Sequence, residues 1–243
     1  RVVVHTARAA RIFGLIPGGH FSEKVIYVYR KQLEEADLIV VNKCDSSSPE
    51  MLERVVLAIN EAFPQAKTFV CSAKHGTNLE SWFESLLSEE APASRSLEIN
   101  YDTYAEGEAL IGWLNCTVSL KTDQPFDGNR TLLALVDDIR NRVVNQGGCI
   151  AHLKTTLDSQ DGSGTLSVVS LVDNNDEPDL RESLLDYVDG GSLVINLRAE
   201  AEPVMLETVT RDAIAALSSI DATIEHLEQF KPGRPIPTHR MTL

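Results

Sequence analysis

The sequence predicts an α/β fold, in which a partial doubly wound parallel sheet precedes a separate α+β domain. Two observations predict it. Over residues 1–88, short apolar runs alternate with patterns of helical period, as in a parallel sheet covered by helices. After a polar stretch containing Pro, Ala and Ser, strand patterns of period two and two amphipathic helices follow to the end of the chain.

The clearest strand is residues 38–41, Leu-Ile-Val-Val, an uninterrupted apolar run typical of a strand buried on both faces of a sheet. It ends in the motif Asn42-Lys43-Cys44-Asp45. A second apolar strand, residues 68–71, ends in the motif Ser72-Ala73-Lys74. Since neighbouring parallel strands deliver their carboxyl ends to the same crevice, we expect the two motifs to lie together.

The residue types of this pair suit recognition of guanine. The Asp45 carboxylate can accept two parallel hydrogen bonds from guanine N1–H and its exocyclic amine, a donor pair that adenine lacks. Asn42 can hold the Hoogsteen edge and tie the two loops together. The stems of Lys43 and Lys74 can cover the two faces of the base, and the Ala73 backbone N–H can donate to O6. The alternative is an ordinary turn in which Asn and Asp act as turn formers.

These motifs resemble the guanine-recognition elements of P-loop GTPases, with Ser72 completing the pocket. Gln32 and Ala36-Asp37 stand before the first motif, as in the metallochaperone GTPases CobW, HypB and UreG. The resemblance covers the first 90 residues or so. It implies that GTP and GDP are the cofactors, together with Mg²⁺ held by residues upstream. It also implies a GTP hydrolase that controls delivery of a metal or corrinoid cofactor. The expected partner is a client metalloenzyme or corrinoid protein, and the protein could form a homodimer.

The chain contains no Gly-x-x-x-x-Gly-Lys-[Ser/Thr] loop to cradle phosphates and no Cys-x-Cys-Cys metal motif. We therefore expect it to be the C-terminal portion of a longer GTPase. Two alternatives stay open: a degenerate domain that never had the loop, and a non-catalytic module for protein interaction or dimerisation.

Composition narrows the class of protein further. With 22 Lys and Arg against 36 Asp and Glu, the formal net charge is −14, which argues against a nucleic-acid or anionic-membrane partner. The four cysteines are scattered, which indicates reduced thiols, and no apolar run reaches transmembrane length. These features predict a cytoplasmic protein. No set of Cys and His has zinc spacing, so we expect no metal site within this chain.

Around the two motifs, the pattern predicts helices over residues 7–15, 23–36 and 49–63. Ser22 is the expected N-cap of the second helix and Pro49 the first residue of the third. A last amphipathic helix would bury a set of apolar side chains: Leu79, Trp82, Phe83, Leu86 and Leu87.

Residues 89–106 are predicted to be a linker, or alternatively a long surface loop, and residues 107–243 a second domain. Its expected strands are 114–120, 149–157, 165–172, 192–199 and 223–230. Helices are expected after the first strand and from Pro203. This order suggests a ferredoxin-like α+β sandwich with an added strand.

Three further features lie outside the predicted set of guanine-binding residues. We expect His75 to be a solvated loop residue and Trp113 to lie in the core. Residues 231–240 form a basic, proline-rich tail that would reach a nucleotide phosphate, dock a partner or pack along its own domain.

Overall fold

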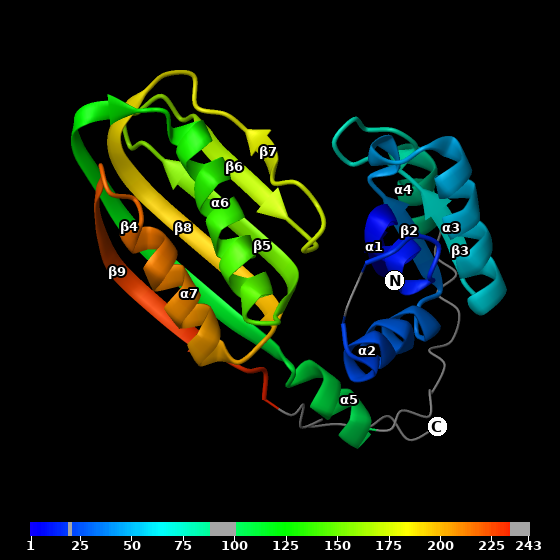
Figure 1. The fold of residues 1–243 in the computed structure, drawn as a ribbon. Helices are drawn as coiled ribbons and strands as arrows, with labels where there is room; N and C mark the ends of the chain where they lie inside the picture. Colours follow the sequence, from blue (N-terminus) through cyan, green and yellow to red (C-terminus); the bar gives the residue numbers. More distant parts are fainter. Residues whose placement is uncertain (19–20, 88–100, 234–243) are drawn as a thin grey trace. The chain divides into compact units, whose positions relative to one another are not determined.

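The computed structural model describes residues 1–18, 21–87 and 101–233. The chain divides into two compact units, of which the first ends at Tyr104 and the second begins at Ala105 (Figure 1). The predicted linker lies mostly outside the described residues, as does most of the proline-rich tail. Within the described ranges, no helix is long and apolar enough to cross a bilayer.

The first unit contains the predicted parallel sheet. Its strands are β1 (Val2–His5), β2 (Leu38–Asn42) and β3 (Lys67–Val70), in the order β1-β2-β3. The central strand is buried on both faces, since Ile39, Val40 and Val41 are at most 2% exposed. The apolar run therefore marks the middle of this sheet, as predicted.

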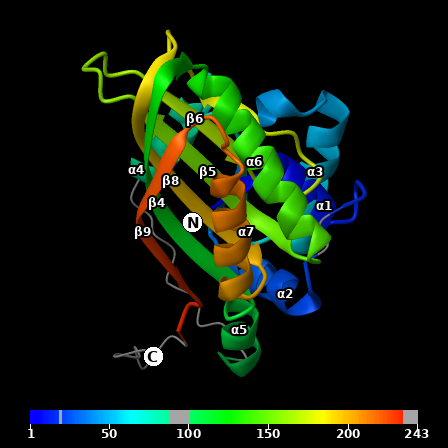
Figure 2. The same ribbon diagram turned by 60° about the vertical axis from the view of Figure 1, so that its left-hand side comes forward.

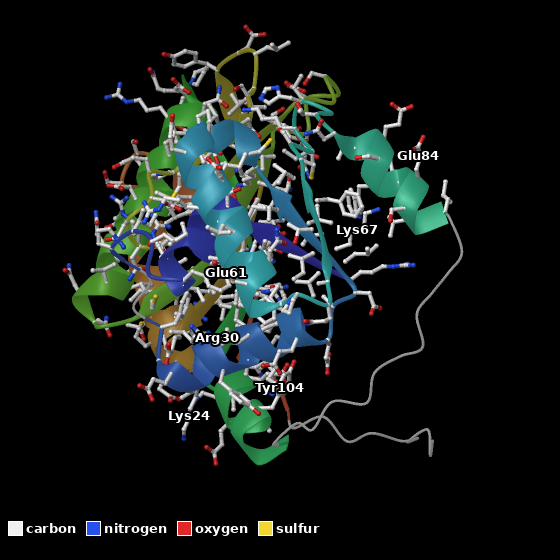
Figure 3. The ribbon with its side chains drawn as sticks, turned by 90° about the vertical axis from the view of Figure 1, so that its right-hand side faces the viewer. Lys24, Arg30, Glu61, Lys67, Glu84 and Tyr104 are labelled. Atoms are coloured by element: carbon white, nitrogen blue, oxygen red, sulfur yellow. The ribbon has the colours of Figure 1, made fainter. Side chains whose placement is uncertain are left out.

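The helices of the first unit pack around this sheet. They are α1 (Thr6–Ile12), α2 (Glu23–Glu34), α3 (Pro49–Ala62) and α4 (Leu79–Leu87), with a short 3₁₀ turn, η1 (Cys44–Ser46). Ile59 of α3 and Leu33 of α2 join the buried cluster around Ile39. Arg30 and Glu61 project from the exposed sides of α2 and α3 (Figure 3). At α3, the Ser48 hydroxyl caps the helix by accepting the Met51 N–H at 3.3 Å.

Three details of this unit differ from the prediction. Ser22 occupies the N-cap of α2, but its hydroxyl makes no capping hydrogen bond. The apolar run Val2-Val3-Val4 is typical of a buried strand, but on β1 Val3 is 56% exposed whereas Val4 is buried. Helix α4 contains the expected apolar side chains but buries none of them, and Phe83 and Leu87 are 47% and 79% exposed. Its amphipathic period was correctly interpreted as helix, whereas none of its apolar side chains is fully buried in the described part of the unit.

The second unit is built on a six-stranded antiparallel sheet in the order β7-β6-β5-β8-β4-β9. The strands are β4 (Ile111–Phe126), β5 (Cys149–Asp158), β6 (Leu166–Leu171), β7 (Asp179–Glu182), β8 (Val188–Glu200) and β9 (Asp221–Phe230). In the sub-order β5-β8-β4-β9, strand β8 lies between β4 and β5, which α6 connects, and β4 lies between β8 and β9, which α7 connects. This is the ferredoxin-like arrangement. Strands β6 and β7 extend it at one edge.

Two helices, α6 (Gly128–Asn145) and α7 (Pro203–Ala215), cover one face of this sheet (Figure 2). Their apolar side chains, such as Ile139 and Leu206, form one buried cluster with the inward residues of the central strands, such as Leu114 and Ile195. The alternation along β4 therefore indicates a strand covered on one face, as predicted.

Trp113 is not in this core, contrary to the prediction. Its neighbours Gly112 and Leu114 are buried, so its side chain lies on the opposite face of β4. There its ring lies 5.6 Å from that of Phe230 on β9, and the Arg198 guanidinium sits 3.7 Å from the ring centroid. The apolar surface of this tryptophan is thus covered by a cation and a second ring instead of by the core.

Besides the short turn η1, one helix and one strand among the described residues were not predicted. Helix α5 (Tyr101–Glu108) occupies the end of the predicted linker, and β7 lies in a charged segment with no strand pattern. β7 forms by pairing with β6, with Leu180 opposite Val169.

Candidate functional site

The carboxyl ends of β2 and β3 meet at one edge of the parallel sheet. The strands are in register with Val41 opposite Val70. Beyond this pair, the Cys71 N–H donates to Val41 O at 2.9 Å and the Cys44 N–H donates to Cys71 O at 3.1 Å. Backbone pairing therefore continues past the strands into the loops, and it brings the two sequence motifs side by side.

Asn42 joins the two loops through its side chain. Its Oδ1 accepts the Lys43 N–H at 2.8 Å and the Ala73 N–H at 3.0 Å, and the Cys71 thiol lies 3.7 Å away. Its backbone oxygen accepts the Thr6 hydroxyl at 2.7 Å, which ties in the start of α1. With Oδ1 committed to the protein, the Nδ2 amine is the group of this side chain available as a donor to a ligand.

Lys43 has a left-handed backbone, with φ 64° and ψ 40°. For a residue with a Cβ this conformation is costly, and it is held here by the loop around it. Ser46 donates to the Lys43 carbonyl twice, from its N–H at 3.0 Å and from its hydroxyl at 2.8 Å. This turn reverses the chain directly after β2 and places Asp45 beside the second loop.

The Asp45 carboxylate lies against the Ser72–Lys74 loop. A hydrogen bond from the Ser72 hydroxyl is the main cause that holds the pKa of Asp45 below its usual range, with smaller contributions from its own backbone N–H, His75 and Lys74. Its side chain is 29% exposed. Asp45 is therefore an ionised group that only accepts hydrogen bonds, as recognition of a pair of N–H donors requires.

The second loop closes on itself. The N–H and carbonyl of Ser72 pair with the carbonyl and N–H of Thr77, both at 3.1 Å, and Gly76 turns the chain with a φ of 70°. Ser72 is buried beneath this loop, whereas Ala73, Lys74 and His75 are exposed. The loop thus presents its tip residues to the site from a fixed base.

All six predicted residues, Asn42, Lys43, Asp45, Ser72, Ala73 and Lys74, lie on these two loops. One detail differs from expectation: the Ala73 N–H, which we assigned to guanine O6, donates to Asn42 Oδ1. The next amide along the loop, the Lys74 N–H, is the alternative donor for O6. Sequence reasoning also set aside His75, whose Nε2 lies 3.8 Å from Asp45 Oδ2. No sequence signal marks this contact, which depends on the closure between Ser72 and Thr77.

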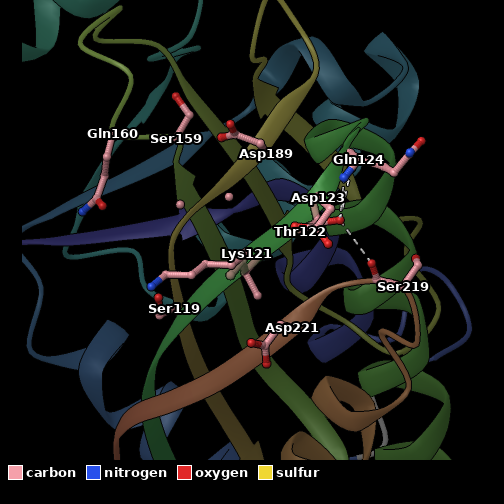
Figure 4. Close-up of a pocket in the computed structure, with 13 residues that line it drawn as sticks. Ser119, Lys121, Thr122, Asp123, Gln124, Ser159, Gln160, Asp189, Ser219 and Asp221 are labelled. Atoms are coloured by element: carbon pink, nitrogen blue, oxygen red, sulfur yellow. Dashed lines mark hydrogen bonds between the residues drawn. The ribbon is translucent and has the colours of Figure 1, made fainter.

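No group of three or more Cys, His, Asp or Glu side chains is placed to hold a metal ion among the residues that the structure describes. In the second unit, an open cavity of about 820 Å³ is lined by polar side chains, including Lys121, Asp123, Asp189 and Asp221 (Figure 4). None of the predicted site residues lines it.

Comparisons with known proteins do not assign the chain to a family. No protein-family model matches the chain, and neither does any curated protein. Among solved structures, a zinc-bound YjiA GTPase from E. coli matches over 88% of this chain at 14% identity with a TM-score of 0.29, and a zinc-bound triple mutant of YjiA matches over 89% at 14% identity with a TM-score of 0.28. The chain spans 59% and 60% of those structures.

Proposed function

We propose that the first unit is the guanine-recognition part of a GTP-binding domain of the kind found in CobW, HypB and UreG. One observation carries the proposal: Asn42 Oδ1 holds the loop of Asn42-Lys43-Cys44-Asp45 against that of Ser72-Ala73-Lys74. This contact gathers a carboxylate, an amide donor and two lysine stems at the carboxyl edge of a parallel sheet, where such folds bind ligands.

Each residue has a distinct role in this proposal. Asp45 accepts the N1–H and the exocyclic amine of guanine, and Ser72 keeps that carboxylate ionised and oriented. The Asn42 Nδ2 donates to the Hoogsteen edge, and the Lys74 N–H donates to O6. The aliphatic stems of Lys43 and Lys74 lie over the two faces of the base.

The wider role follows from the resemblance in sequence. The full-length protein would be a cytoplasmic GTPase in which nucleotide state gates delivery of a metal or corrinoid cofactor to a client enzyme. Bound Mg²⁺ would neutralise charge on the phosphates, held by residues upstream of this chain. The first unit would supply selectivity for the base, and therefore the preference for GTP over ATP.

The test is a calorimetric titration of GDP and of ADP into the full-length protein that contains this chain, with Mg²⁺ present. We expect GDP to bind and ADP to give no detectable heat. In the variant Asp45→Asn the carboxamide can donate to the C2 carbonyl of xanthine, so XDP should bind better than GDP.

Two results would reject the proposal. An Asp45→Asn variant that keeps the preference for GDP over XDP would remove Asp45 from the site. Binding of neither GDP nor ADP to the natural protein would favour the other class, a non-catalytic interaction module with a degenerate nucleotide domain.

A further inference from the structure

His75 is held at the rim of the candidate guanine site through its backbone. Its N–H donates to Ser72 Oγ at 3.3 Å, and Ser72 is also the main cause that lowers the pKa of Asp45. The imidazole is carried to within 3.8 Å of Asp45 Oδ2, with its side chain 55% exposed. One serine thus binds the backbone of this histidine and favours the ionised form of the carboxylate beside it.

Both oxygens of Asp45 are needed for guanine, one for N1–H and one for the exocyclic amine. A protonated His75 attracts the same carboxylate, and the distance of 3.8 Å is that of an ion pair. A base that binds both oxygens of Asp45 therefore competes with this ion pair for the same carboxylate. A neutral imidazole offers no such competition.

We propose that His75 competes with guanine for Asp45, so that binding of a guanine nucleotide is linked to loss of a proton from this site. The inference rests on the proposed function. Histidine is the side chain that ordinarily changes charge between about pH 5 and 8. The charged groups that act on Asp45 in the structure are His75 and Lys74, both from the second loop. Asp45 itself stays ionised over this range, so His75 supplies the change of charge.

The expected sign follows from the competition. A protonated His75 attracts the Asp45 carboxylate, so the proposal expects a lower affinity for GDP at low pH than at high pH. A partly exposed ion pair is weak, and we expect affinity to drop about two- to fivefold between about pH 8 and about pH 5.5. Over the same range, GDP binding should release protons, in an amount that is greatest near the middle of the titration.

The test is calorimetric titration of GDP into the full-length protein at several pH values, in two buffers of different ionisation enthalpy. His75→Gln keeps a polar side chain of similar reach but cannot become cationic. It should bind GDP as the natural protein does near pH 8, with a flatter pH dependence and less proton release. His226→Gln is the matched control, because His226 also lies near a carboxylate, Glu228 at 4.0 Å, but on the sheet of the second unit. It should behave like the natural protein.

The phosphates of GDP also titrate in this range, but they do so equally with every variant and cancel in the comparison. If His75→Gln and the natural protein show the same pH dependence and the same proton release, the proposal is wrong while the guanine site stands. If the natural protein fails to bind GDP even near pH 8, the guanine site is wrong and the proposal falls with it.

Discussion

The backbone N–H of Ala73 donates to the side-chain oxygen of Asn42 at 3.0 Å, across 31 positions of sequence. The same oxygen accepts the Lys43 N–H, so a single atom of Asn42 fixes the relative position of two loops. This shared acceptor couples the shape of the candidate site to the stability of the unit around it.

Replacement of Asn42 should therefore lower both nucleotide affinity and stability. Asn42→Ala leaves the partly buried Lys43 amide and the exposed Ala73 amide without their acceptor, and we expect a loss of about 1 kcal/mol in the free energy of unfolding. Asn42→Asp retains an oxygen for both amides and should lose less stability, while it removes the Nδ2 donor and weakens GDP binding. Urea unfolding followed by circular dichroism measures the first effect and calorimetry the second. Equal stability of the two variants would contradict the role of Oδ1.

Stability should also depend on pH through Asp45. The pKa of Asp45 is lower in the folded chain than in the unfolded chain, so its ionisation stabilises the fold at neutral pH. This contribution is lost as pH falls through the folded-state pKa. Because the group is partly exposed, it should stay below about 1 kcal/mol. Ser72→Ala removes the main cause of the lowered pKa and should cost this stability at pH 7 but not in strong acid. A loss of the same size in acid would show that Ser72 acts through packing or through the hydrogen bond it accepts from the His75 N–H, and not through Asp45.

Gly191 on β8 is predicted to tolerate no side chain. Its φ is 149°, and a Cβ there would lie 2.3 Å from the Asp158 carbonyl oxygen on the neighbouring strand. Gly191→Ala must therefore part β5 from β8, and we expect a loss of about 2 kcal/mol or more. Gly233→Ala is the control, since nothing lies within 4 Å of its Cβ position. Thermal unfolding of the two variants compares them directly, and an unchanged midpoint for Gly191→Ala would mean that the strands separate freely.

Thiol reactivity should report on the site. Cys71, Cys116 and Cys149 are at most 5% exposed, whereas Cys44 is partly exposed between Lys43 and Asp45. Burial also raises the pKa of Cys116 to about 11, which keeps it protonated. With a thiol-specific disulfide reagent we expect Cys44 to react first, and GDP to slow that reaction. Cys44→Ser should abolish the fast phase. A fast phase that survives in this variant would place an accessible thiol elsewhere.

The fold was largely predictable because its strongest signals are apolar periodicities. The run from Leu38 to Val41 identified the central strand, and alternation from Leu114 to Leu120 identified a strand covered on one face. The same alternation places Trp113 on the face opposite to Leu114. Its assignment to the core therefore disagreed with the strand pattern, and the structure shows that the pattern was the better guide.

The site was predictable in its residues and less so in its contacts. The motif Asn42-Lys43-Cys44-Asp45, placed directly after an apolar strand, indicated that Asn42 and Asp45 would lie at the carboxyl edge of the parallel sheet. The left-handed turn at Lys43, the commitment of the Ala73 amide and the approach of His75 depend on backbone geometry that no local pattern encodes. Likewise β7 forms because β6 offers an edge to pair with, and not because its own residues favour a strand.

The first and last strands of the second unit are neighbours, with Trp113 opposite Phe230. Chain entry at β4 and chain exit at β9 are thus at the same end of an antiparallel pair, about 4.8 Å apart. A force applied between these two points would act in the unzipping geometry. It would break the hydrogen bonds between β4 and β9 one after another and would not load them all in shear at the same time. The ladder between β4 and β9 is therefore mechanically soft, and tension on the chain would peel β9 from the sheet before it disturbed the strands beneath.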